Sequence, residues 1–294
     1  MKISLFHILM LRKILIIFTV CINFLLISCR EDITLEIPPY ESKLAVFCVL
    51  NPFREPALLL NRSKANFNYA DTSRETQYIT DALVVITDLT TGVKDTLKVR
   101  NFGQASWPMN GGGFHTTQPY YVGKNKPEIG HRYKLEIWHK NEYLHAETFI
   151  PQPVTIKSVT YKKSKSIEYE GFNDVTFTLK FDDIAGEQNA YVTTMLTSGN
   201  YYDYTYKYDH NNDGKELTDQ HRIIMYPHDT GLIPLAVENH TLQTAEYISA
   251  LYKQSEFTTH FFTEPSIVKH NINGGLGIFG AVSRHQFYFV VHVK

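Results

Sequence analysis

The stretch Ile79-Thr80-Asp81-Ala82-Leu83-Val84-Val85-Ile86-Thr87-Asp88 decides the fold class of this chain. Its apolar residues are mostly β-branched and form a short run, Ala82 to Ile86, between polar residues, which is typical of a β-strand. Thr90-Thr91-Gly92 supplies a tight turn, and residues 93–99 read as a returning strand. Period and turn chemistry together predict a β-hairpin.

Further strands of the same kind flank this hairpin. Residues 43–50 and 56–61 are short apolar runs before it, and residues 143–149 form a return strand after it. In Gly130-His131-Arg132-Tyr133-Lys134-Leu135-Glu136-Ile137, every second residue is apolar. Short strands at this spacing predict an immunoglobulin-like β-sandwich over residues 43–150. The Gly-x-x-Tyr-x-Leu-x-Ile pattern resembles the carboxypeptidase regulatory domain, a β-sandwich module.

Pro151-Gln152-Pro153 interrupts the strands, because proline cannot donate to a β-ladder. We place a domain boundary there. Residues 154–161 and 175–181 again read as strands, residues 244–254 form one short amphipathic helix, and residues 281–294 return to strand. The fold class is therefore mainly β, with a second β-rich domain over residues 151–294 that contains one short helix.

Four tyrosines form a stripe in this second domain. Tyr202, Tyr204, Tyr206 and Tyr208 lie at every second position and share one face of a predicted strand. Such a stripe is either a binding or partner face, or the packing face of a wide hairpin. We favour packing, because buried aromatics are common in sheets.

Asp209-His210-Asn211-Asn212-Asp213-Gly214 fits the first half of a calcium loop. Asp209, Asn211 and Asp213 would supply oxygen ligands at alternate positions. The twelfth position should be a bidentate glutamate but is Gln220. We therefore prefer a polar hairpin turn and no bound cofactor, with calcium as the alternative.

Gly275, Gly277 and Gly280 are spaced as in a dinucleotide-binding loop. That motif needs a following helix, whereas residues 281–294 read as a strand, so we reject nucleotide binding.

The N-terminus reads as a secretory signal. Basic Lys2, Arg12 and Lys13 precede an apolar run that ends in Leu26-Ile27-Ser28-Cys29. A small residue before a cysteine resembles the lipobox of bacterial lipoproteins, which implies cleavage after residue 28 and lipidation of Cys29. The alternative is an uncleaved anchor helix, but the run is short for a bilayer and contains Thr19 and Asn23.

Residues 29–42 read as a tether that contains Pro38-Pro39. Arg30-Glu31-Asp32 resembles the charged tag of surface lipoproteins in Bacteroidota. Lipid chains on Cys29 would hold the chain on the outer membrane, since each buried CH2 contributes about 0.8 kcal/mol.

Composition and motifs narrow the function classes. With 29 basic and 30 acidic residues there is no electrostatic footprint for nucleic acid. Once Cys21 leaves with the signal and Cys29 carries lipid, Cys48 is alone and reads as a buried hydrophobe. The chain has neither Gly-x-Ser-x-Gly nor His-Glu-x-x-His, so we expect no enzyme. A carboxylate-pair hydrolase stays open as the less favoured alternative.

At this point the chain resembles a Bacteroidota outer-membrane lipoprotein family of unknown function, commonly encoded beside TonB-dependent receptors. The resemblance rests on Cys29, on residues 43–50 and 80–86, on Asp213-Gly214-Lys215-Glu216 and on the glycine-rich segment 271–281. It implies a cell-surface accessory or binding subunit of a TonB-dependent β-barrel or another outer-membrane complex. A scaffold or cap without its own ligand is the alternative.

Overall fold

The computed structural model describes residues 10, 12–13, 15–18, 41–63, 78–101, 103–105, 114–116, 118–195, 206–208, 213–225, 230–257 and 268–292. The chain divides into two compact units, residues 1–40 and residues 41–294. The described residues of the first unit are helical. No described helix is both long and apolar enough to span a bilayer.

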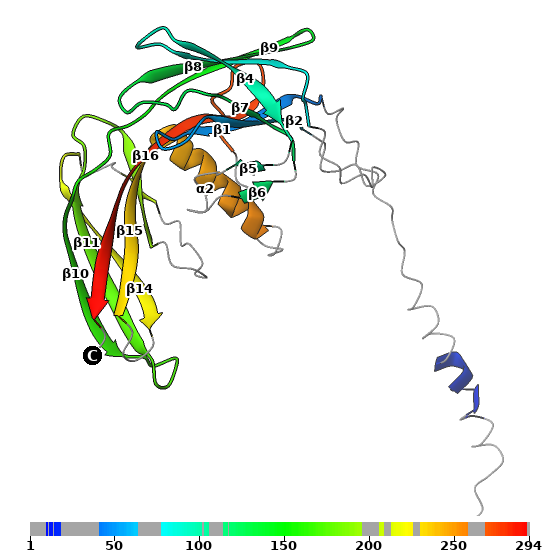
Figure 1. Ribbon diagram of the computed structural model, residues 1–294. Helices are drawn as coiled ribbons and strands as arrows, with labels where there is room; N and C mark the ends of the chain where they lie inside the picture. Colours follow the sequence, from blue (N-terminus) through cyan, green and yellow to red (C-terminus); the bar gives the residue numbers. More distant parts are fainter. Residues whose placement is uncertain are drawn as a thin grey trace, which may run out of the picture. The chain divides into compact units, whose positions relative to one another are not determined.

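The second unit is mainly β, as the sequence predicts (Figure 1). Its first nine strands are β1 (Leu44–Leu50), β2 (Ala57–Arg62), β3 (Leu83–Asp88), β4 (Lys94–Arg100), β5 (Gly103–Ala105), β6 (Phe114–Thr116), β7 (Tyr120–Val122), β8 (Arg132–His139) and β9 (Glu142–Phe149). The remaining elements are β10 (Ile156–Lys165), β11 (Asn173–Asp182), β12 (Asn189–Met195), β13 (Lys207–Tyr208), β14 (Glu216–Met225), β15 (Thr230–Thr241), helix α2 (Leu242–Phe257) and β16 (Leu276–His292).

The predicted hairpin is β3 and β4, which pair antiparallel from Val84–Leu97 to Thr87–Lys94. Asp88 closes the turn, since its Oδ1 accepts hydrogen bonds from the backbone N–H groups of Thr90 at 2.8 Å and Thr91 at 3.3 Å. This is the aspartate-capped turn that short polar side chains favour.

The sheets are organised by a pairing that joins the two ends of the unit. β1 runs parallel to β16, from Ala45–Leu276 to Leu50–Ala281. An eleven-stranded sheet results, in the order β13-β12-β15-β16-β1-β2-β7-β4-β3-β8-β9, while β10, β11 and β14 form a separate sheet. Because β16 serves both halves of the chain, the domain boundary near Pro151 stays a prediction.

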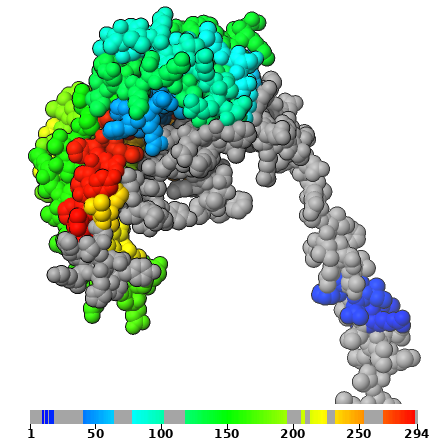
Figure 2. Space-filling model, viewed as in Figure 1, coloured from blue at the N-terminus to red at the C-terminus, as the bar shows by residue number. Residues whose placement is uncertain are grey.

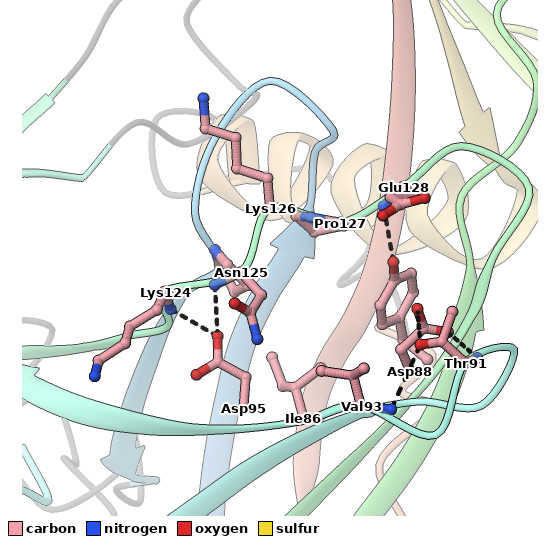
Figure 3. A pocket seen from close by; sticks show the side chains of 12 residues that line it. Ile86, Asp88, Thr91, Val93, Asp95, Lys124, Asn125, Lys126, Pro127 and Glu128 are labelled. Atoms are coloured by element: carbon pink, nitrogen blue, oxygen red, sulfur yellow. Dashed lines mark hydrogen bonds between the residues drawn. The ribbon is translucent and has the colours of Figure 1, made fainter.

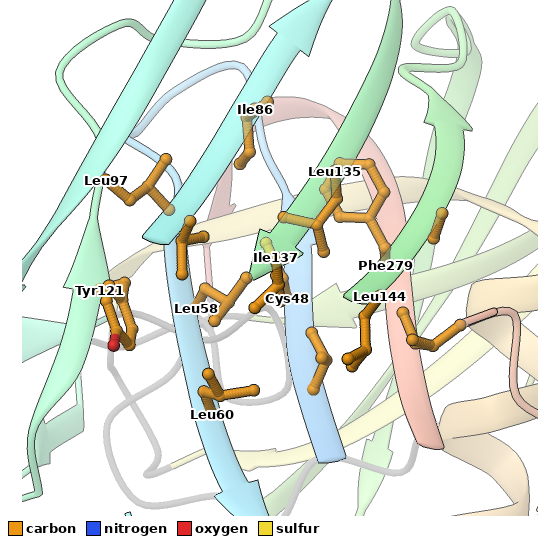
Figure 4. Close-up of a cluster of buried hydrophobic side chains, with 14 of the residues drawn as sticks. Cys48, Leu58, Leu60, Ile86, Leu97, Tyr121, Leu135, Ile137, Leu144 and Phe279 are labelled. Carbon is orange, nitrogen blue, oxygen red and sulfur yellow. The ribbon is translucent and has the colours of Figure 1, made fainter. Parts of the chain in front are cut away.

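The N-terminal half has the sandwich layout. Figure 4 shows side chains of β1 and β2 facing those of β3 and β8 across one core. Leu58, Leu135 and Ile137 are fully or almost fully buried there. Cys48 lies in this core as the small hydrophobe that the sequence indicates, and burial raises the pKa of its thiol above the ordinary value.

A second core lies between the three-stranded sheet and strands β12, β15 and β16. Phe181 and Tyr191 meet edge to face with ring centroids 5.3 Å apart. Phe177 of β11 packs in the same way against Phe289 of β16 at 5.8 Å. Edge-to-face contacts of this kind stabilise the core beyond what the buried area of the rings contributes.

The glycine-rich segment is a packing seam. Gly277 has φ +105°, and a Cβ atom there would lie 1.8 Å from the carbonyl oxygen of Val46 on β1. A Cβ atom on Gly280 would lie 2.2 Å from the hydroxyl oxygen of Thr244 on α2. Strand β16 begins at Leu276, five residues before the predicted start at residue 281. Gly277 and Gly280 therefore lie within the strand and allow close approach between elements.

Helix α2 begins two residues before and ends three residues after the predicted range of 244–254. Its buried Ala245 and Ile248 lie on one side, and the hydroxyl of Thr244 accepts the backbone N–H of Ala281 at 3.0 Å. The helix is therefore fixed to the point where β16 passes from β1 to β15.

Candidate functional site

Part of the predicted tyrosine stripe lies among the described residues. Tyr206 and Tyr208 are half-buried with ring centroids 6.0 Å apart, whereas Tyr202 and Tyr204 lie outside the described residues. The hydroxyl of Tyr208 is 2.9 Å from Ser249 Oγ on α2. The ring of Tyr206 meets the ring of His240 at 5.3 Å and 89°. These two tyrosines pack between strands and helix.

Of the three predicted calcium ligands, the structure describes Asp213, whereas Asp209 and Asn211 lie outside the described residues. Asp213 Oδ1 accepts the backbone N–H of Gly186 at 2.6 Å, and the next residue, Gly214, donates its N–H to Asp183 at 2.7 Å. Asp213 thus holds two turns together. Whether calcium binds stays a prediction, as does the lipidation of Cys29, which also lies outside the described residues.

Glu238 is the most buried charged group among the described residues, and its neighbour His240 contacts Tyr206. Glu238 of β15 accepts a hydrogen bond from Arg284 Nε at 2.9 Å and a second, shorter one from its Nη2. Its other carboxylate oxygen is 3.0 Å from His240 Nε2. Burial by itself raises the pKa of Glu238, but the hydrogen bond from His240 and the charge of Arg284 outweigh it, so the pKa is lowered.

This cluster has part of the arrangement of a catalytic carboxylate–histidine pair. The carboxylate orients one ring nitrogen, and the Nδ1 atom of His240 has no hydrogen-bond partner among the described residues. His240 is, however, only 1% exposed. Since a general base must reach its substrate, the described part of this cluster fits a structural role in joining β15 to β16.

The sequence analysis did not single out Glu238, His240 or Arg284. The signal that would have found them is the run Glu238-Asn239-His240, which places polar residues directly after the apolar strand residues 232–237. Buried polar residues in a strand are informative because each needs a partner.

A second polar cluster joins the two sheets of the C-terminal half. Asp219 of β14 contacts Lys207 Nζ at 3.0 Å and His221 Nε2 at 3.2 Å, and Thr193 donates its hydroxyl to Asp219. Burial by itself raises the pKa of Asp219, but hydrogen bonds from His221, Thr193 and Lys207 lower it to about 2.

A nucleophilic triad could use the residue types of Thr193, His221 and Asp219. Their hydrogen bonds, however, are not arranged as in such a triad. Thr193 Oγ1 and Asp219 Oδ2 both meet the same ring nitrogen of His221, Nε2. A working triad needs the acid on one nitrogen and the nucleophile on the other. The geometry is that of a salt-bridged clamp between sheets.

The N-terminal half carries a polar pocket of about 440 Å³ beside the β3–β4 turn (Figure 3). Asp95 Oδ2 accepts the backbone N–H groups of Lys124 at 2.6 Å and Asn125 at 2.9 Å. At the other side, the backbone N–H of Glu128 donates to the hydroxyl of Tyr133 at 2.7 Å. These bonds hold the 124–128 segment over the pocket.

Asp88, the second carboxylate of this pocket, is also hydrogen-bonded to neighbouring residues. Asp88 Oδ2 lies 2.9 Å from His131 Nδ1 and 2.8 Å from Thr91 Oγ1. Burial by itself raises the pKa of Asp88, but these hydrogen bonds and those of the turn outweigh it and lower the pKa. Both carboxylates thus anchor the neighbouring loops through the hydrogen bonds that they accept. Among the described residues, no group of three or more His, Cys, Asp or Glu side chains is arranged to hold a metal ion.

Comparison with known proteins gives a family. A search of curated proteins finds no match. Residues 30–287 match the family described as a domain of unknown function, DUF4249. The match begins just after Cys29 and ends within β16, and so covers both halves of the β-rich unit. The chain is a member of the DUF4249 family.

Proposed function

We propose that this protein is a lipoprotein of the outer membrane that acts as an accessory or binding subunit of a TonB-dependent receptor or another outer-membrane complex. The observation that carries the proposal is the N-terminal order of charges, apolar run, Ser28 and Cys29. The receptor and the assignment to Bacteroidota rest on the family resemblance.

The first unit supports this proposal. Its described residues are helical, and the side chains of Leu15, Ile16, Ile17 and Phe18 are 56–67% exposed. Apolar side chains without a protein core are suited to a membrane or to removal by a signal peptidase.

The lipid anchor is tested in the full chain with a palmitate analogue that can be tagged after incorporation. We expect the purified protein to carry the label and Cys29→Ser to abolish it. Cys48→Ser is the matched control, because Cys48 is fully buried and should leave labelling unchanged. Equal labelling of the wild type and Cys29→Ser would refute the anchor.

Surface exposure is tested on intact cells. A protease added outside should cleave the chain without lysis if the protein faces the medium. Protection until the outer membrane is permeabilised would place the protein on the inner leaflet and contradict this part of the proposal.

The partner is tested by purifying the tagged full chain from gently solubilised outer membranes. We expect a β-barrel protein to co-purify in stoichiometric amount. Recovery of the chain alone at several detergent conditions would contradict the accessory role. Copurification that depends on Tyr206 or Tyr208 would favour the binding-face interpretation of the stripe over the packing one.

A further inference from the structure

Strand β16 has one side that is paired along only part of its length. On one side β16 pairs with β15, from Val282–His240 to His292–Thr230. On the other side its partner β1 ends at Leu50, opposite Ala281. The chain after β1 turns into β2, so from Val282 to His292 that side has no paired strand among the described residues.

The direction of the backbone groups follows from the contacts at the start of the strand. Phe279 exchanges backbone hydrogen bonds with the side chain of Asn271, and Ala281 donates its N–H to Thr244. These odd-numbered residues therefore point away from β1. Because direction alternates along a strand, the even-numbered residues Gln286, Tyr288 and Val290 point their N–H and C=O groups toward the unpaired side.

Most other described edges carry the charges that natural sheets use to prevent unwanted pairing. β10 bears four lysines and an irregularity in its register between Ile156 and Ser158. β14 contains Glu216, Asp219 and Arg222, and β9 contains Glu142 and Glu147. Residues 286–291 of β16, Gln-Phe-Tyr-Phe-Val-Val, contain no charged side chain.

The open stretch packs on the second core and presents exposed apolar side chains. On the inner face, Phe289 packs on Tyr161 at 5.7 Å and on Phe177 at 5.8 Å. On the outer face, Tyr288 is 61% exposed and Val290 is 46% exposed, and Leu232, 61% exposed, lies opposite Val290. Figure 2 shows the C-terminal part of β16, in red, at the molecular surface.

We propose that residues 286–290 of β16 are a docking edge that adds one extended strand of a partner protein, with acidic residues flanking an alternating apolar core. Strand addition uses main-chain hydrogen bonds for affinity and alternate side chains for specificity. The acidic flanks follow from β10, an edge strand that packs on β16 through Tyr161 and carries Lys162 and Lys165 in addition to Lys157, which pairs with Asp182.

A second copy of this chain fits the edge less well. Pairing β16 with β16 of another copy would bring the two lysine-bearing β10 strands to the same side of the interface. Like charges at short range disfavour that arrangement. The proposal does not depend on membrane anchoring, because it rests only on residues of the β-rich unit.

The test uses the full chain purified in detergent and a labelled ten-residue peptide, Glu-Glu-Thr-Val-Thr-Tyr-Thr-Val-Glu-Glu, capped at both ends. Fluorescence anisotropy should show saturable binding. A peptide with lysine in place of each glutamate should bind about tenfold more weakly or not at all. The assay contains neither membrane nor receptor, so its failure would leave the proposed function untouched.

Two variants at one position separate the backbone from the side chain. Val290→Pro removes an N–H group that points to the open edge and does not take part in pairing with β15. This substitution should weaken peptide binding about tenfold or more. Val290→Ala keeps the N–H and should bind within about threefold of the wild type. Equal binding by the two variants would overturn the proposal.

Hydrogen exchange of the unmodified chain gives an independent measurement. The acidic peptide should slow exchange at the amides of Gln286, Tyr288 and Val290. The N–H groups of Phe287 and Phe289 point toward β15 and should already be protected. No saturable binding by the acidic peptide and no change at these amides would overturn the proposal. A concentration-dependent dimer that protects the same amides would also overturn it, because the occupant would be a second copy.

Discussion

Arg284 on β16 lies directly opposite Glu238 on β15, and its guanidinium donates two hydrogen bonds to one carboxylate oxygen. Glu238 is almost completely buried and also contacts His240. An ion pair in such a place is costly to break, because the remaining partner keeps a buried charge without compensation.

We therefore expect Arg284→Met to lower the free energy of unfolding by about 3–5 kcal/mol. The measurement is urea unfolding of the full chain followed by tryptophan fluorescence. Lys180→Met removes one side of the exposed Lys180–Glu216 pair and should leave the midpoint nearly unchanged. Equal effects of the two substitutions would show that burial of Glu238 contributes nothing to the fold.

The Asp219 clamp predicts an acid dependence of stability. Its pKa is lowered from 3.8 to about 2 in the folded chain, so its contribution is present above pH 3.8 and is lost as the pH falls toward 2. Asp219→Asn should lower the melting temperature at pH 6, and the difference from the wild type should shrink as the pH falls through this window. A difference that stays constant with pH would show that the carboxylate charge is not the cause. Glu168→Gln, at an exposed ion pair with Arg222, is the control.

Two glycines with positive φ provide a matched test of the packing seam. Gly92 has φ +78° in open space, so Gly92→Ala should cost about 1 kcal/mol from the backbone alone. Gly277→Ala adds a clash with the Val46 carbonyl and should cost about 4 kcal/mol or more, or prevent folding. The measurement is urea unfolding, supplemented by the yield of folded protein. Similar costs at both positions would contradict the close approach of β16 to β1.

The burial of Cys48 predicts a protected thiol. Alkylation with iodoacetamide at pH 8, followed by mass spectrometry of the peptide that contains Cys48, should show little modification of the native chain. Modification should become rapid in 6 M guanidinium as the core opens. Rapid native labelling would contradict both the burial and the raised pKa of this thiol.

Several elements follow from local sequence alone. The β-branched run from Leu83 to Asp88 and the turn at Gly92 give β3 and β4, and the 3.6-residue pattern around Ala245 and Ile248 gives α2. These patterns are local because a strand or helix must bury one face whatever lies opposite it. The segment after Gly280 is a strand, which its sequence pattern also indicates.

The partners of those faces do not follow from local sequence. Nothing near Glu238 identifies Arg284 as its partner, because the two meet only when β15 and β16 pair. The two described tyrosines of the stripe pack on His240 and Ser249, which are distant in sequence. No local sequence pattern indicates that β16 pairs with β1.

The sequence by itself determined that this protein is mainly β, where its hairpin and helix lie, and which residues at the N-terminus resemble a lipoprotein signal. These properties depend on patterns within about 20 neighbouring residues. Only the tertiary structure decided that the last strand completes the first sheet, that Glu238 is paired within a core, and that β16 continues past β1 along an edge with no paired strand among the described residues. Each of these depends on contacts between residues far apart in the chain, whose pairing is set by the packing of whole sheets.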